Sequence, residues 1–240
     1  NYIFQRSKII MNISGLQKLT LLDFPGRLAC TVFTSGCNLR CPFCHNASLV
    51  LPGNTPHMET EEVLSFLKKR VGILEGVCIT GGEPCLQSDL EEFIVTVRSM
   101  GFLIKLDTNG SFPQKLSSLL EKGLLDYVAM DIKTSKENYL KVCGVNNNKL
   151  LENVIESVEI LKSSSVPHEF RTTTAKELQT KEDFGKIGEW LRGEKRYFIQ
   201  QYETDGELVG EEMTPYSKEE LFAFADVMRN FVTDVEVRGV

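Results

Sequence analysis

Basic residues are in the minority in this 240-residue chain, which carries 27 Lys and Arg against 33 Asp and Glu. An acidic balance argues against a general nucleic-acid binder, because such proteins carry a basic excess. No apolar run approaches the ~18 residues that a membrane span needs, and the first ten residues, NYIFQRSKII, lack the apolar stretch of a signal peptide. We therefore expect a cytoplasmic protein that binds neither nucleic acid nor a membrane.

Flexible linkers and low-complexity tracts are also missing. Hydrophobic residues make up 42% of the chain, which is enough to bury one sizeable core. We expect a single domain over residues 11–240, preceded by an N-terminal extension over residues 1–10. The seven cysteines are an odd number in a chain without secretory features, which argues against a disulfide framework. Their role must therefore be sought in their spacing.

Short β-rich runs alternate with amphipathic helical patterns along the chain. This alternation predicts an α/β fold with a parallel sheet and right-handed crossovers, either doubly wound or a complete or partial barrel. Six strands are predicted at 28–34, 77–80, 102–107, 127–131, 168–172 and 197–201, with a further strand at 235–240. Glycines and polar residues follow the carboxyl ends of the six strands. Ligands bind at that rim in both architectures, so the pattern indicates a site there.

Three predicted helices have N-termini that can be located in the sequence. Thr60 is expected to cap the helix that begins beside it. Ser88 and Glu91 have the spacing of a capping box, and Ser217 is expected to open the last helix. These positions test how well local sequence alone predicts helix boundaries.

Three cysteines lie within eight residues, in the segment GCNLRCPFCHN. Cys37, Cys41 and Cys44 can converge on one centre if the chain loops around it, and such soft ligands bind zinc or an iron–sulfur cluster. A zinc site would take His45 or another cysteine as its fourth ligand. However, no second cysteine pair follows, and His45 directly adjoins Cys44, which makes joint ligation awkward. Three ligands on a four-iron cluster would leave one iron open to a substrate or cofactor.

This spacing, with Phe43 before the third cysteine, resembles the Cys-x3-Cys-x-aromatic-Cys signature of the radical S-adenosylmethionine (SAM) superfamily. One βα unit later, a second segment resembles the glycine-rich stretch that meets the methionine amino group of SAM in that family; it consists of Gly81, Gly82, Glu83 and Pro84. The resemblance implies a partial (β/α)6 TIM-like barrel, a [4Fe-4S] cluster on the three cysteines, and SAM on the open iron. A reduced cluster would then cleave SAM to methionine and a 5′-deoxyadenosyl radical.

Residues 15–46 resemble activating enzymes of glycyl radical enzymes, most closely the longer form of the anaerobic ribonucleoside-triphosphate reductase activating protein. This resemblance implies that the enzyme abstracts a hydrogen atom from a glycine of that large partner. It also implies reduced flavodoxin or ferredoxin as the electron donor. Activases of pyruvate formate-lyase or another glycyl radical enzyme are alternatives. A small-molecule radical SAM enzyme resembling 7-carboxy-7-deazaguanine synthase and a non-enzymatic zinc module are further alternatives.

Segments 106–110 and 130–133 resemble the pyruvate formate-lyase activating enzyme. The resemblance implies that Asp107, Thr108 and Asp131 surround a monovalent cation beside the SAM carboxylate, and that Lys133 approaches SAM. The alternative is that Asp107 starts a turn and Asp131 caps a helix, because those structures need the same residue types. Lys133 is equally consistent with a solvated loop charge.

The four remaining cysteines are scattered singly. Cys30 and Cys78 lie in apolar strands and are expected to be buried small hydrophobes. Cys85 is expected near the site without being a ligand, and Cys143 is expected in a polar loop. None of the four is assigned a shared role.

Other polar residues have no motif around them. His57 and His168 are expected to be structural, and no general base is expected, because hydrogen-atom abstraction needs none. Arg171 and Gln200 end strands inside the predicted barrel. They are expected either to contact the ribose or the target loop, or to form hydrogen bonds at the rim.

Overall fold

A computed structural model describes residues 9–51, 57–203 and 208–240. Its centre is one eight-stranded sheet, in which each strand pairs with the next along the chain. The strands are β1 (Ile13–Thr20), β2 (Ala29–Thr34), β3 (Gly76–Gly81), β4 (Leu103–Thr108), β5 (Tyr127–Asp131), β6 (His168–Thr174), β7 (Arg196–Gln201) and β8 (Asp234–Arg238). β2 to β8 are parallel to one another, whereas β1 is antiparallel to β2.

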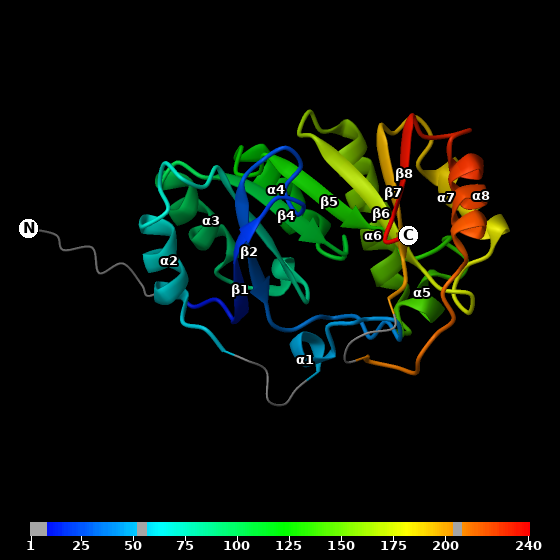
Figure 1. The fold of residues 1–240 in the computed structure, drawn as a ribbon, viewed down its shortest axis with the longest axis horizontal. Coiled ribbons are helices and arrows are strands. Elements are labelled where there is room, and N and C mark those ends of the chain that lie inside the picture. The colour runs from blue at the N-terminus through cyan, green and yellow to red at the C-terminus, as the bar shows by residue number, and fades with distance from the viewer. Residues whose placement is uncertain (1–8, 52–56, 204–207) are drawn as a thin grey trace, which may run out of the picture.

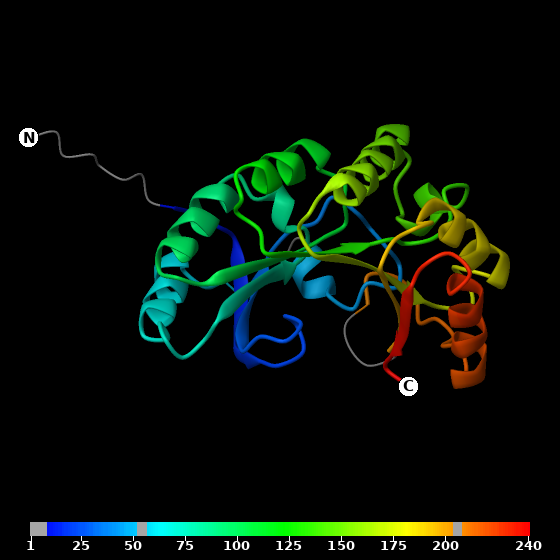
Figure 2. The same ribbon diagram turned by 90° about the horizontal axis from the view of Figure 1, so that it is seen from above.

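Helices cover the convex face of the sheet, as the view from above shows (Figure 2). They are α2 (Thr60–Lys68), α3 (Leu90–Ser99), α4 (Pro113–Glu121), α6 (Asn148–Ser163), α7 (Lys181–Trp190) and α8 (Lys218–Met228). Two short helices, α1 (Ala47–Val50) and α5 (Tyr139–Val142), and a 3-10 turn at Pro84–Leu86 lie in the loops. None of the helices in the described ranges combines the length and hydropathy needed to cross a membrane.

The sheet curves into a partial barrel, which confirms the predicted α/β architecture (Figure 1). All strands wind in chain order with helices on one side, so the doubly wound alternative is wrong. β1 and β8 are the two edges and do not pair with each other. The predicted strands agree with β2 to β8 within a few residues. β1 was not predicted, because its centre is exposed and its sequence lacks a continuous apolar run.

The helix starts agree only in part with the prediction. Ser217 caps α8 in a reciprocal capping box with Glu220, as expected. At α2, Glu59 is the N-cap position; the expected cap Thr60 is the first helical residue, and its hydroxyl accepts a hydrogen bond from the Met11 amide. At α3, the predicted box of Ser88 and Glu91 is wrong, because the N-cap is Asp89 and none of its side-chain atoms caps the helix.

Tertiary contacts explain the difference at α3. One carboxylate oxygen of Asp89 accepts from the Ile10 amide at 2.9 Å, and the other accepts from Ser88. Asp89, which could have capped the helix, therefore binds the backbone near residue 10 instead. Residues 1–8 of the expected N-terminal extension lie outside the described residues.

The core lies between the strands and the outer helices. Strands β3 to β5 are almost fully buried, since helices cover one face and the barrel interior lies against the other. The interior itself is polar: β4 contributes Lys105 and Asp107, and β6 contributes Glu169 and Arg171. Near the amino ends of the strands a small apolar layer of Phe24, Ala29 and Tyr127 closes it.

Candidate functional site

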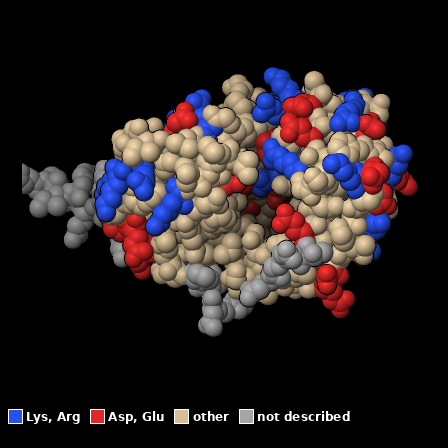
Figure 3. Space-filling view, in the orientation of Figure 1, with Lys and Arg blue, Asp and Glu red and all other residues tan. Residues whose placement is uncertain are grey.

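A cavity of about 190 Å³ opens at the carboxyl ends of the strands. It lies in the hollow of the face shown in Figure 3, where acidic and basic side chains gather together. All but two of the predicted site residues line it, namely Cys37, Cys41, Phe43, Cys44, Gly81, Gly82, Asp107, Thr108, Asp131 and Lys133. The two exceptions are Glu83 and Pro84, which are buried and are not part of the lining.

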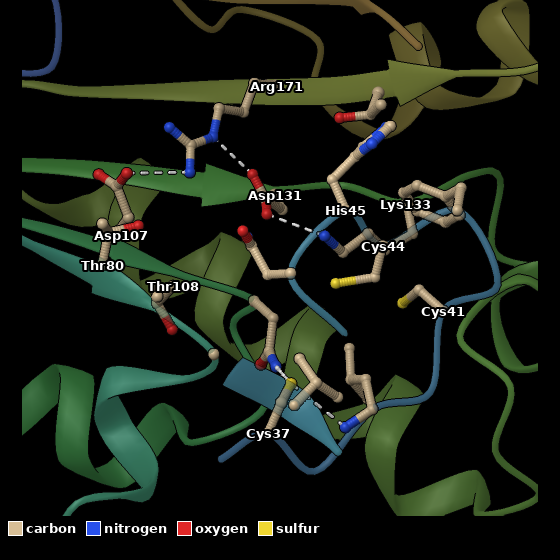
Figure 4. Close-up of a pocket in the computed structure, with 18 residues that line it drawn as sticks. Cys37, Cys41, Cys44, His45, Thr80, Asp107, Thr108, Asp131, Lys133 and Arg171 are labelled. Carbon is tan, nitrogen blue, oxygen red and sulfur yellow. Dashed lines mark hydrogen bonds and ion pairs between the residues drawn. The ribbon is translucent and has the colours of Figure 1, made fainter. Parts of the chain in front are cut away.

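The loop after β2 brings the three clustered cysteines to this cavity (Figure 4). It turns on itself where the Cys44 amide donates to the Cys41 carbonyl at 3.1 Å. Neighbouring segments hold it from outside: the Arg40 amide donates to the Cys143 carbonyl at 3.0 Å, and the Gly210 amide donates to the Pro42 carbonyl at 3.0 Å. Three soft ligands therefore border one cavity on a braced loop.

The donor set fits an iron–sulfur cluster. In the described residues, no three His, Cys, Asp or Glu side chains are arranged around a single metal ion. A four-iron cluster takes one thiolate on each of three irons, so its ligands need not converge on one point. Burial raises the pKa of Cys37 to about 11 and raises that of Cys44 as well. Without a metal, these two side chains are therefore neutral thiols at neutral pH.

The scattered cysteines are all buried. Cys30 packs in the core, as predicted. Cys78 is buried too, but its sulfur lies 3.8 Å from both an Asp107 oxygen and the Lys105 ammonium. The predicted burial of Cys78 is therefore confirmed, but its sulfur faces the polar interior, because alternate residues of β3 point to that side.

Cys143 does not lie in a polar loop, as its flanking sequence predicted. It is fully buried at the end of α5. A hydrogen bond with the Cys143 thiol lowers the pKa of Cys41. The fold thus places a fourth cysteine beside one of the three in the motif, although about a hundred residues separate them in the sequence.

The glycine-rich segment after β3 packs directly on the cysteine loop. The Glu83 amide donates to the Gly36 carbonyl at 2.8 Å. A Cβ at Gly82 would lie 2.0 Å from that same carbonyl oxygen, and Gly81 has a φ of +115°. Only glycine satisfies both the conformation and the contact, so the two loops meet as closely as two backbones can.

Glu83 connects the glycine segment with the end of β4. Its buried carboxylate accepts from the Cys85 amide at 2.9 Å, the Thr108 hydroxyl at 2.8 Å and the Asn109 amide at 2.7 Å. Burial raises the pKa of Glu83 although these three donors oppose the rise. Cys85 is buried behind the cavity lining, where it is not positioned as a ligand.

A row of alternating charges crosses the cavity wall. Lys105 pairs with Asp107, whose other oxygen lies 3.1 Å from Arg171. Arg171 also lies 2.5 Å from one oxygen of Asp131, and Lys133 lies 2.8 Å from the other. Burial alone would raise the pKa of both carboxyl groups, but the neighbouring cations hold the pKa of each below its ordinary value. All five side chains are therefore charged at neutral pH.

Lys133 is thus not a solvated loop charge, and Arg171 forms the hydrogen bond at the rim that was one of its two expected roles. Burial would lower the pKa of Lys133, but Asp131 raises it well above the ordinary value. Its ammonium also lies 5.7 Å from the centre of the Phe43 ring. Gln200, at the end of β7, is not part of the cavity lining.

Sequence reasoning missed three members of the site. Lys105 lies in the middle of β4, and its only sequence signal is that it shares a strand face with Asp107 two residues later. Asn109 donates from its side-chain amide toward Cys37, at 3.8 Å from the sulfur. His45, considered only as a metal ligand, lines the cavity with both ring nitrogens buried and unpaired among the described residues, and its ring packs 4.9 Å from that of Tyr202.

The two histidines without a motif are both paired. His168 donates from Nδ1 to the Val166 carbonyl at 2.9 Å, and its Nε2 lies 2.8 Å from the Glu194 carboxylate, away from the cavity lining. His57 lies on the surface beside Glu59. Neither contributes to the lining, in keeping with structural roles.

Comparison with known proteins gives one family and several relatives. The model of the Radical SAM superfamily matches residues 31–191. A putative glycyl-radical enzyme activating enzyme of Methanocaldococcus jannaschii is 29% identical over 236 residues, covering 95% of this chain and 96% of the relative. A pyruvate formate-lyase-activating enzyme of Listeria monocytogenes is 28% identical over 159 residues, covering 61% of this chain and 63% of the relative.

A solved structure shares the fold at low sequence identity. The crystal structure of Streptococcus suis SuiB bound to S-adenosylmethionine superposes with a TM-score of 0.67 at 14% identity, covering 85% of this chain and 48% of SuiB. This similarity supports the partial-barrel architecture and carries no argument about the substrate.

Proposed function

Since the chain belongs to the radical SAM superfamily, we propose that it is an activating enzyme that generates the glycyl radical of a large partner enzyme. The observation that carries this proposal is the similarity to the Methanocaldococcus jannaschii relative over nearly the whole of both chains. The narrower proposal is that the partner is the anaerobic ribonucleoside-triphosphate reductase. The resemblance of residues 15–46 to activating proteins of that reductase supports it.

Family membership implies a [4Fe-4S] cluster and SAM. When bound, these two groups supply a 5′-deoxyadenosyl radical, which would take a hydrogen atom from the partner's glycine. We propose that Cys37, Cys41 and Cys44 hold the cluster, because they border the cavity on one braced loop. Gly81 and Gly82 have no side chains, so their backbone would approach the amino group of SAM closely.

The charged wall would orient the other end of SAM. Lys133 and Arg171 line the cavity, and their positive charges would face the carboxylate of its methionine moiety. Phe43 would form part of the apolar wall beside the cluster. Charges held in place before the ligand arrives cost no reorganisation when it binds, so they favour one orientation of SAM.

The partner must bring its glycine to this cavity. The cavity opens at one rim of the barrel, so the loop that carries the glycine would have to leave its place in the partner and enter there. Reduced flavodoxin or ferredoxin is the proposed electron donor, and it would reach the cluster from the side of the cysteine loop.

Electron paramagnetic resonance tests the proposal directly. The reconstituted protein is mixed anaerobically with the purified reductase, SAM and a reductant, and in parallel with pyruvate formate-lyase. We expect the doublet of a glycyl radical with the reductase, and none when SAM is omitted or when Cys37→Ala replaces the wild type. A doublet with pyruvate formate-lyase alone would overturn the narrower proposal. Production of 5′-deoxyadenosine without a doublet from either partner would overturn the proposal for these two partners.

A further inference from the structure

The resemblance to the pyruvate formate-lyase activating enzyme implies a monovalent cation among Asp107, Thr108 and Asp131, and the geometry does not fit one. A cation site needs oxygen atoms that are free to coordinate. Every carboxylate oxygen of the two aspartates already faces a cationic side chain of this chain. The Thr108 hydroxyl is also engaged, because it donates to Glu83 at 2.8 Å and its oxygen accepts from the Gly110 amide at 3.2 Å.

The net charge of these side chains also disfavours an added cation. Two carboxylates are matched by three cations, namely Lys105, Arg171 and Lys133, so the cluster carries a net charge of about +1 at neutral pH. Two further carboxylates lie close by and are also engaged: Glu83 accepts from the Thr108 hydroxyl at 2.8 Å, and Glu169 lies 3.6 Å from Arg238 and accepts from the Tyr127 hydroxyl at 2.8 Å. An added alkali ion would therefore have to compete with these three cationic side chains for the same aspartate oxygens.

Lys105 is one of the two cationic side chains that contact Asp107, and the other is Arg171. Lys105 reaches from the middle of β4 to Asp107, and its side chain is only 3% exposed. Its ammonium also lies 3.8 Å from the Cys78 sulfur, and neither residue is part of the cavity lining. A buried ammonium is stable there because Asp107 repays the loss of hydration, which raises the pKa of Lys105 although burial alone would lower it.

We infer that the ammonium of Lys105 takes the place of a monovalent cation at this site, so that the enzyme binds SAM without sodium or potassium. Lys105 is then a positioning residue: it holds Asp107, which holds Arg171, which faces the cavity beside Asp131. This inference concerns the charge of the site and holds for any partner whose glycine is activated.

The test compares alkali and organic cations at equal ionic strength, so that screening is the same in each buffer. SAM affinity of the reconstituted protein is measured by anaerobic calorimetry in KCl, NaCl and choline chloride. The melting temperature of the metal-free protein is measured in the same three salts, as a readout that does not depend on activity. The variants are Lys105→Met, Lys105→Arg, and Arg98→Met as a control that breaks a partly buried ion pair outside the site.

For the wild type we expect SAM affinities within about twofold across the three salts and melting temperatures within ~1 °C, because no site for an alkali ion is present. For Lys105→Met in choline chloride we expect SAM affinity to fall about tenfold or more. KCl or NaCl should restore most of it and raise the melting temperature. Lys105→Arg and Arg98→Met should show no preference for any salt.

Two results would overturn the inference. One is a wild-type protein whose SAM affinity or melting temperature rises specifically with potassium or sodium. The other is a folded Lys105→Met variant that loses SAM affinity in all three salts alike, since Lys105 would then not stand in for an ion. If Lys105→Met does not fold, the salt dependence of the wild-type protein alone decides whether the inference stands.

Discussion

A single added methyl group tests whether the contact between the two loops creates the site. In Gly82→Ala, the new Cβ would lie 2.0 Å from the Gly36 carbonyl oxygen and 2.6 Å from its carbon, whereas real Cβ atoms essentially never come within 3.0 Å of such neighbours. Both atoms belong to backbone, so no rotamer change relieves the clash. One loop must move by about 1 Å, and a misplacement of that size at reacting groups costs about 100-fold in rate.

The stability cost follows from the same overlap. Overpacking of this kind destabilises proteins by about 1 to 3 kcal/mol, which corresponds to a melting temperature about 2 to 12 °C lower for a chain of this length. The shift would also weaken the 2.8 Å hydrogen bond from the Glu83 amide to Gly36, so the glycine segment would move away from the cysteines.

Two measurements check this prediction. The rate of 5′-deoxyadenosine release with a chemical reductant should fall about 100-fold, while the iron content stays unchanged because the three cysteines remain. The matched control is Gly185→Ala in helix α7, where an added Cβ meets nothing within 4 Å. It should stabilise the protein by about 0.5 to 1 kcal/mol. A Gly82→Ala variant with wild-type rate and melting temperature would refute the argument that the two loops leave room only for glycine.

Four further variants probe other parts of the structure. Glu83→Gln replaces an acceptor of three hydrogen bonds by a group that can accept fewer, so the free energy of unfolding should fall by about 1 to 3 kcal/mol in urea denaturation, and an unchanged midpoint would contradict this. Burial would lower the pKa of His168, but Glu194 raises it, so this pair stabilises the fold below a pH of about 6.5 and loses its effect as the pH rises through the raised pKa. Glu194→Gln should therefore cost about 1.5 to 3 kcal/mol near pH 6 and clearly less near pH 9, whereas an equal cost at both would argue against the charged pair. Cys41→Ala should lose the bound iron, while Cys143→Ala should keep about four irons per chain, and iron loss in both would make Cys143 a ligand.

Local patterns predicted the elements that local physics controls. Strands β2 to β8 are found from sequence because each is a short β-rich run, and the strands buried on both faces are almost continuously apolar. The cysteine loop is found because its ligands are neighbours in the chain. Local patterns did not predict β1, because its pairing with β2 forms it. They also did not predict the start of α3, because the contact of Asp89 with Ile10 decides it.

The sequence by itself determined the superfamily, the parallel α/β order and the three cysteines, because each depends on residues that are close together in the chain. Only the tertiary structure decided the partners of the charges. Lys105, Asp107, Asp131 and Arg171 come from three strands, and their pairing depends on which side chains share the barrel interior. It likewise placed Cys143 beside Cys41. Long-range contacts of this kind leave no periodic trace in the sequence, because only the register of neighbouring strands brings the side chains together.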